Sequence, residues 1–185
     1  MMRKDRAKPV NSPGDIPPKY RHTPIGLLLR YHNLREDFKS YSQARLLVGM
    51  CMDSRKHLHI PDNFAFILRT GGANLRTSEF KVSYAVAVGG VSHIALIGHT
   101  RCGMVNLAAR KDIFIKGLVR RGGWKRKDAE EHFTQVSEMF EIGEATDFIL
   151  SETKRLRLRY PKVTVAPMLY KVEDNLLYLL REKEN

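Results

Sequence analysis

The two cysteines of the chain stand where they could do chemistry. Cys51 closes an apolar run of six residues, and Cys102 stands three residues after His99, which follows a second apolar run. Two thiolates and an imidazole suit zinc, and three protein ligands leave the fourth tetrahedral position open. A structural zinc site would normally close that position with a fourth Cys or His, and the chain has no third cysteine. These residues are therefore candidate ligands of a reactive zinc ion.

Simpler interpretations of the same residues remain open. Free cysteine is among the most buried residue types, so Cys51 and Cys102 could be core residues without a metal. They could also form a disulfide, which a reducing compartment disfavours. His99 could be an ordinary core histidine, because the His-x-x-Cys spacing is short enough to arise by chance. Spacing alone does not decide for a metal.

A carboxylate and a guanidinium follow the first cysteine. Asp53 stands two residues after Cys51, and Arg55 stands two residues after Asp53. The two side chains can form a bidentate salt bridge that fixes the carboxylate beside a metal. The alternative is a surface ion pair that contributes little. Asp53 and Arg55 are therefore the candidate catalytic residues.

Three short apolar runs predict the strands that would position these side chains. They cover residues 46–51, 64–68 and 94–97. Such runs are typical of buried parallel strands, and a helix predicted at residues 79–88 between the second and third indicates an α/β domain. Ligands bind outside the carboxyl ends of strands in such a sheet. Since both cysteines and His99 follow strand ends, we expect them to converge at one place.

The rest of the chain completes this pattern. Helices are predicted at residues 25–39, 125–140 and 144–159, with further strands at 163–169 and, at the sheet edge, 176–180. The region after Cys102 is predicted to be helical, broken by Gly117 and by Gly122-Gly123. The fold class is therefore α/β, with a mostly parallel central sheet of four or five strands flanked by helices and an N-terminal helical arm. We expect residues 1–22 to form an extended basic arm and residues 23–185 to form one domain.

Composition excludes several classes of protein. Of 185 residues, 43% are hydrophobic and 28% charged, which is unlike a disordered or fibrous chain. No apolar run reaches the ~18 residues that span a bilayer. Residues 1–10 also lack the apolar core of a secretory signal. We therefore expect a cytoplasmic protein with no membrane partner.

The formal net charge of +12 raises the question of a polyanionic partner. Residues 1–50 carry +6, residues 51–109 carry +3, and the remainder carries +3. A basic arm can attract the phosphates of nucleic acid, or it can pack on a partner subunit. Because no aromatic residue stands among the charges of residues 1–19, we expect the second role, and nucleic-acid binding that is at most weak and unspecific.

Two motifs together resemble a known enzyme family. Cys51-x-Asp53-Ser54-Arg55, followed by Gly98-His99-x-x-Cys102-Gly103, resembles the signature of the β-class carbonic anhydrases, and the likeness covers residues 46–107. Arg69-Thr70-Gly71-Gly72-Ala73-Asn74 resembles that family's Arg-Asn-Ala-Gly-Asn segment. The two metal motifs are specific in this order and separation. The resemblance implies zinc held by Cys51, His99 and Cys102, with Asp53 and Arg55 as the adjoining dyad.

The resemblance also implies a reaction and an assembly. It implies reversible hydration of carbon dioxide to bicarbonate by zinc-bound hydroxide, in a homodimer or larger homo-oligomer. In that family Asp53 would either occupy the fourth zinc position, which closes the site, or pair with Arg55 and leave room for water. Two thiolates cancel the formal charge of zinc, so an acceptor must orient the water, and Asp53 is the candidate.

Two departures from the family pattern leave the substrate open. Thr70 stands where the family usually has Asn, and Met104 replaces the second glycine that commonly follows the cysteine. One alternative is a hydrolase of carbon disulfide or carbonyl sulfide on the same zinc site. Another is a non-catalytic, zinc-containing basic binding module, supported by Trp124-Lys125-Arg126-Lys127 and Arg155-x-Arg157-x-Arg159. A binding module has no need of the dyad, which favours an enzyme.

Overall fold

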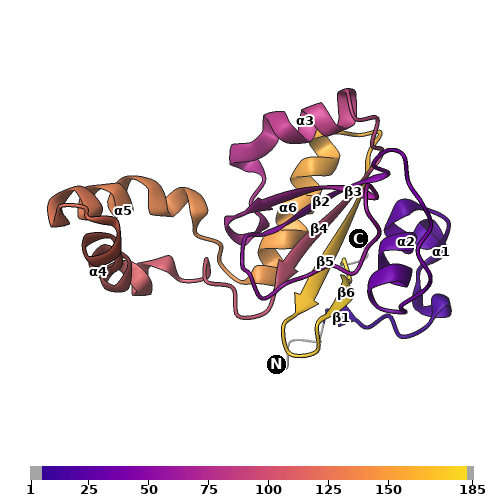
Figure 1. The fold of residues 1–185 in the computed structure, drawn as a ribbon, viewed down its shortest axis with the longest axis horizontal. Coiled ribbons are helices and arrows are strands. Elements are labelled where there is room, and N and C mark those ends of the chain that lie inside the picture. Colours follow the sequence, from indigo (N-terminus) through magenta and orange to yellow (C-terminus); the bar gives the residue numbers. More distant parts are fainter. Residues whose placement is uncertain (1–5, 183–185) are drawn as a thin grey trace.

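The computed structural model describes residues 6–182, in which a central sheet lies between two groups of helices (Figure 1). The strands are β1 (Ala7–Lys8), β2 (Leu46–Cys51), β3 (Ala65–Thr70), β4 (His93–His99), β5 (Thr164–Lys171) and β6 (Leu176–Leu180). The helices are α1 (Pro18–Arg21), α2 (Pro24–His32), α3 (Glu79–Ala87), α4 (Lys111–Gly122), α5 (Arg126–Phe140) and α6 (Ala145–Arg159). The α/β fold predicted from the sequence is confirmed.

The sheet has the order β1-β6-β5-β4-β2-β3. Its centre is parallel, because β2 pairs with β3 and β4, and β4 pairs with β5. β6 and β1 extend the sheet in antiparallel fashion. The sheet therefore has six strands instead of the predicted four or five. The additional strand, β1, comes from the segment expected to be an arm, and it displaces β6 from the sheet edge.

Alternation along β2 divides the core into two halves. Val48 and Met50 pack into one buried cluster with side chains of α1 and α2. Leu47 packs into a second cluster with side chains of α3 and α6. The two helix pairs accordingly lie on opposite faces of the sheet (Figure 1). No helix within residues 6–182 has the length and apolarity that a bilayer crossing needs.

The amino-terminal segment folds onto its own chain. Val10, Ile16 and Tyr20 are buried in the core cluster that contains α2. Residues 6–22, expected to be extended, thus include strand β1, a 3-10 turn and helix α1, because these apolar side chains find partners on the sheet. Residues 1–5 lie outside the described part. The helix expected at residues 25–39 ends at His32. Packing of this segment on a neighbouring subunit stays a prediction.

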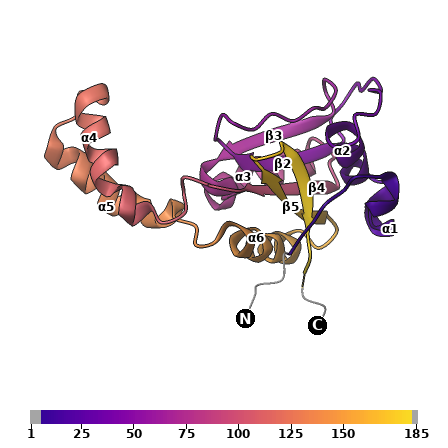
Figure 2. The same cartoon turned by 90° about the horizontal axis from the view of Figure 1, so that it is seen from below.

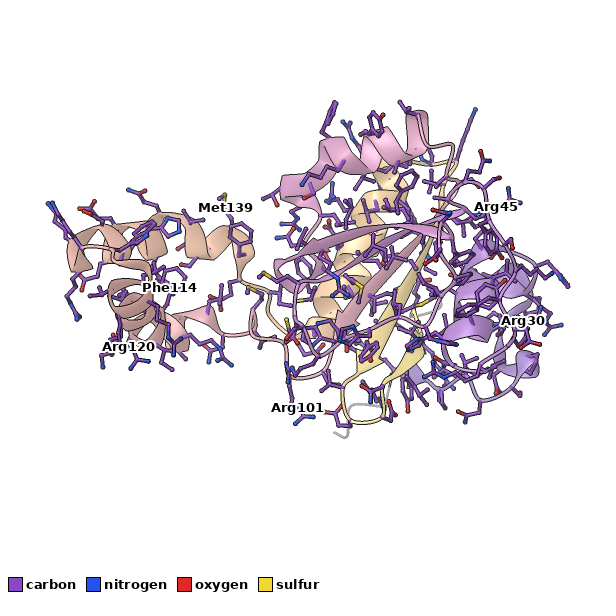
Figure 3. All side chains as sticks on the ribbon, in the orientation of Figure 1. Arg30, Arg45, Arg101, Phe114, Arg120 and Met139 are labelled. Atoms are coloured by element: carbon purple, nitrogen blue, oxygen red, sulfur yellow. The ribbon has the colours of Figure 1, made fainter. Side chains whose placement is uncertain are left out.

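Helices α4 and α5 form a hairpin that projects from the body (Figures 1 and 2). The predicted break at Gly117 does not occur, since α4 continues to Gly122 and ends where Gly123 adopts a φ of 69°. Phe114, labelled in Figure 3, packs against Phe133 of the other helix, and the two ring centroids lie 5.2 Å apart. A helix ended by a left-handed glycine and followed by a second helix makes a fixed turn at the tip.

Two glycines allow a matched test of core packing. A Cβ at Gly98 in β4 would lie 2.6 Å from Cγ1 of Ile149 in α6, whereas a Cβ at Gly117 would meet nothing within 4 Å. We expect Gly98→Ala to lower the free energy of unfolding by ~1–3 kcal/mol, because the added methyl group would overpack the core. Gly117→Ala should raise it by ~0.5–1 kcal/mol, because alanine favours a helix. Urea denaturation would measure both, and equal effects would contradict this packing.

Candidate metal centre

The carboxyl ends of β2 and β4 bring three potential ligands together. Cys51 is the last residue of β2, His99 is the last residue of β4, and Cys102 follows three residues later. All three are buried, and their ligand atoms lie within 4.8 Å of one another. The two Sγ atoms are 4.0 Å apart, and both cysteines are free. Zinc–sulfur bonds of about 2.3 Å at tetrahedral angles place two sulfurs roughly 3.8 Å apart, so the spacing suits one zinc ion.

His99 has its Nε2 atom available to bind a metal ion. Nδ1 of His99 lies 2.9 Å from the carbonyl oxygen of Thr100, which can only accept a hydrogen bond, so Nδ1 carries the proton. Nε2 is buried and has no hydrogen-bond partner among the described residues. A buried, unpartnered nitrogen is unfavourable unless something binds it, and metal-ligating histidines typically donate their other N–H to a carbonyl. The donor set therefore fits zinc.

The two thiols differ in their readiness to ionise. A hydrogen bond from Cys102, together with backbone amides of Asp53 and Gly72, holds the pKa of Cys51 well below its usual value. Cys102 holds the shared proton, and this hydrogen bond and burial raise its pKa. Without a metal the pair thus resembles one thiolate and one thiol. A cation at this position would favour loss of the second proton.

The dyad forms with bidentate geometry. The Arg55 guanidinium donates from Nη2 to Oδ2 of Asp53 at 2.7 Å and from Nε to Oδ1 at 3.0 Å. Hydrogen bonds from that guanidinium, and from the backbone N–H of Arg55, hold the pKa of Asp53 far below its usual value. Arg55 Nη2 also donates to the carbonyl oxygen of Arg101 at 3.0 Å. The pair therefore links the loop after β2 to the loop after β4, which an isolated surface ion pair would not do.

Two further cations, Lys56 and Arg69, support the loop after β2, and the sequence predicted a role for neither. The side chain of Lys56 is fully buried, and its Nζ donates to the backbone oxygen of Asp53 at 3.1 Å. Burial lowers the pKa of Lys56, although the negative charges nearby oppose this. Arg69 donates to the backbone oxygens of Cys51 and Lys56 at 3.3 and 3.0 Å. Lysine is almost always exposed, so composition predicts the opposite environment for Lys56.

Both departures from the family pattern lie against the centre. Thr70 is in register with Cys51, and its Oγ1 is buried with no hydrogen-bond partner in the described part of the chain. Met104 packs so closely that its Sδ would lie 3.1 Å from a Cβ at Gly71.

The residues after Thr70 form a turn. Gly72 takes a φ of 63°, and the side chain of Asn74 donates to the backbone oxygen of Met139 at 2.9 Å. The segment of residues 71–74 is thus a tight turn that brings the end of α5 close to the centre.

An apolar cavity of about 280 Å³ lies between this turn and the projecting hairpin. Met52, Gly71 and Met104 line it from the body. From the hairpin it is lined by Leu107, Phe114, His132, Phe133, Val136, Ser137 and Phe140. The sequence did not predict this cavity, because it forms between segments that are far apart in the chain. The cavity therefore places an apolar surface beside the segments that follow Cys51 and Cys102, through Met52 and Met104.

Comparison with known families gives one assignment for most of the chain. The sequence profile described as "Carbonic anhydrase" matches residues 46–174. This range contains all three candidate ligands and the dyad. No curated protein matches the sequence.

Solved structures with the same fold have distant sequences. A β-carbonic anhydrase of Trichomonas vaginalis is 17% identical, with a TM-score of 0.63 over 80% of this chain and 90% of that one. A carbonic anhydrase of Glaciozyma antarctica is 23% identical, with a TM-score of 0.58 over 74% and 82%. An apo carbon disulfide hydrolase is 21% identical, with a TM-score of 0.54 over 76% and 80%. At these identities the likeness establishes the fold.

Proposed function

Because the chain belongs to the carbonic anhydrase family, we propose that it is a zinc enzyme that catalyses the reversible hydration of carbon dioxide to bicarbonate. The observation that carries this proposal is the joint presence of a three-donor cluster and an aligned carboxylate–guanidinium pair. The cluster alone indicates only that a metal ion can bind there. The pair adds a fixed hydrogen-bond acceptor beside a site with three protein ligands.

Each residue has a role in this proposal. Cys51, His99 and Cys102 hold zinc, which when bound lowers the pKa of water so that hydroxide is available near neutral pH. Asp53 accepts a hydrogen bond from the attacking water and so orients its lone pair. Arg55 holds the Asp53 carboxylate away from the metal. The apolar walls near Met104 suit an uncharged, linear substrate.

The test combines two measurements on one preparation. We expect about one zinc per chain by elemental analysis and hydration of carbon dioxide in stopped flow. Chelation should abolish the activity, and added zinc should restore it. A zinc-loaded protein that does not hydrate carbon dioxide at any pH would contradict the proposed reaction and leave the metal assignment intact.

Carbon disulfide or carbonyl sulfide is the second candidate substrate. Similarity to a carbon disulfide hydrolase fold, and the apolar cavity beside Met104, support it. Release of hydrogen sulfide from either compound, in the absence of carbon dioxide hydration, would identify this reaction. A zinc-loaded protein inactive on all three compounds would leave the non-catalytic module.

We further propose a homodimer in the cytoplasm, where both thiols would stay reduced. An exposed apolar face supports the dimer. Phe80, Tyr84 and Val88 recur at helical spacing along α3 with 81%, 54% and 67% of their surface exposed. Phe66 and Ile67 are exposed on the neighbouring edge strand β3. A second copy docked along α3 and the free edge of β3 would bury these side chains.

Phe80→Lys is expected to shift the protein toward the monomer, because a charge would be buried in the interface. Light scattering at several protein concentrations would measure the shift. Lys81→Glu is the matched control, since this exposed neighbour lies off the apolar stripe. An unchanged mass in Phe80→Lys would place the interface elsewhere.

A further inference from the structure

Most of the excess positive charge lies on α4 and the tip of the α4–α5 hairpin, at residues 110–127. Residues 110–127 hold eight Lys or Arg and one Asp, a net of +7 within a chain total of +12. Residues 128–185 hold eight Lys or Arg and twelve Asp or Glu, a net of −4. The +3 counted for residues 110–185 as a whole therefore conceals a strongly basic element beside an acidic one.

These cations are open to solvent, and few are neutralised. All eight are exposed. Arg126 and Lys127 form ion pairs with Glu130 and Glu131, at 2.8 and 3.8 Å. Within residues 6–182, no ion pair forms at the other six, which are Arg110, Lys111, Lys116, Arg120, Arg121 and Lys125. Like charges crowded on one element repel each other, which an anionic partner would relieve.

An aromatic side chain lies in the middle of the charge. Residues 120–127 form the tip of the hairpin, with five cations, no acidic residue and Trp124. Trp124 is 40% exposed, and its ring centroid lies 5.2 Å from that of His132. Its backbone N–H donates to the oxygen of Leu118 at 3.2 Å. The ring is therefore held by His132 and partly open to solvent, in a segment that also carries Arg121 and Lys125.

The tip is also well placed for an extended partner. Figure 2 shows the hairpin reaching away from the sheet, and Figure 3 shows Arg120 on it, apart from the body. Phe114 and Phe133 pack on each other between the helices, so the hairpin is a rigid support for the tip. A chain-like ligand could reach residues 120–127 without contacting the metal centre.

We propose that residues 120–127 bind single-stranded nucleic acid without sequence preference, with Arg120, Arg121 and Lys125 on phosphates and Trp124 stacked on a base. Cations that flank an exposed aromatic ring suit a strand whose bases are unpaired. A duplex offers phosphates but no open base for Trp124. A lipid surface needs an apolar helix face, whereas Trp124 is the one large apolar residue of the tip.

The chain carries its own reporter for this test, because Trp124 is its only tryptophan. The full-length, zinc-loaded protein is titrated with twelve-nucleotide oligo(U) or oligo(dT), a duplex of equal length, and phosphatidylserine vesicles. We expect either single strand to quench the fluorescence, and whichever binds more tightly identifies the nucleic acid. If three phosphates are contacted, the logarithm of the association constant should fall with the logarithm of the salt concentration at a slope of about −2.

Two triple variants distinguish binding at the tip from attraction by the overall positive charge of the protein. Arg120→Gln, Arg121→Gln and Lys125→Gln combined should weaken binding at least ~10-fold and flatten the salt slope. Lys39→Gln, Lys154→Gln and Lys162→Gln remove equal charge from exposed positions elsewhere and should have little effect. Trp124→Leu, followed by anisotropy of a labelled strand, should weaken binding ~10-fold. Zinc content and hydration should not change in any of them, so failure here is distinct from failure of the proposed enzyme.

Three results would overturn the proposal. Equal weakening by both triple variants would mean diffuse charge attraction. Equal affinity for duplex and single strand, with Trp124→Leu unaffected, would exclude stacking. A blue-shifted fluorescence with vesicles, and no response to oligonucleotides, would identify the tip as a membrane contact.

Discussion

Cys51→Ser and Cys102→Ser are each expected to lose most of the bound zinc, with the dissociation constant rising at least ~100-fold. A neutral hydroxyl replaces a thiolate in a buried cluster whose ligand atoms lie within 4.8 Å of one another. The change in side-chain size is small, so the loss would reflect the donor atom. Competition with a coloured chelator would measure the affinity.

Stability provides a second measurement that does not need activity. Zinc binds the folded chain and so raises its free energy of unfolding by mass action. A chelator should therefore lower the melting temperature of the wild type and leave that of both serine variants unchanged. Thr70→Val is the matched control, since it alters a buried side chain in register with Cys51 and removes no metal donor. Full zinc retention in both serine variants would contradict the assignment of the centre.

The convergence of the three candidate ligands could be predicted from the sequence, because they are close in sequence or lie at strand ends. Asp53 and Arg55 are two residues apart, so their pairing depends on one turn. Convergence of Cys51 with His99 required only that β2 and β4 be adjacent parallel strands. The six buried residues of β2 made that strand recognisable.

What the sequence could not predict depends on contacts between distant segments. Lys56 is buried because the turn after β2 folds its ammonium group back onto the oxygen of Asp53. Ala7 and Lys8 become a strand only because β6 offers a free edge. The direction in which α4 and α5 leave the body has no periodic signal. The cavity beside Met104 depends on that direction and could therefore not be predicted. The basic motif Trp124-Lys125-Arg126-Lys127 is visible in the sequence, but its position at a projecting tip is not.

Asp53→Ala and Arg55→Ala are expected to retain zinc and to lose hydration activity ~100-fold or more, as removal of a positioned acceptor does. Neither side chain belongs to the three-donor cluster. The measurement is the stopped-flow hydration rate against pH, with zinc assayed in each protein. Ser54→Ala is the matched control within the same turn and should keep both zinc and rate.

The pH dependence of the hydration rate should not come from titration of Asp53. Arg55 lowers the pKa of Asp53 in the folded protein below its value in the unfolded chain, about 3.9. The stabilisation from the pair is therefore complete above that unfolded value and is lost only as pH falls through the lower folded pKa. A rise in wild-type rate between pH 6 and 9 would then report deprotonation of the attacking water. A rate that instead follows a group titrating near pH 4 would contradict this role.

Arg55→Ala can reduce the rate in two ways, and a double variant separates them. Without Arg55, Lys56 at 3.7 Å is the one ion-pair partner left to the Asp53 carboxylate within residues 6–182, and the carboxylate is free to enter the fourth metal position. If Asp53 blocks the metal, the double variant Asp53→Ala/Arg55→Ala should be faster than Arg55→Ala, and the visible spectrum of cobalt-loaded Arg55→Ala should differ from that of the double variant. If orientation alone is lost, the double variant should match Asp53→Ala. Equal rates in the wild type and all three variants would show that the dyad is a surface ion pair, because an acceptor that orients the attacking water cannot be removed without cost.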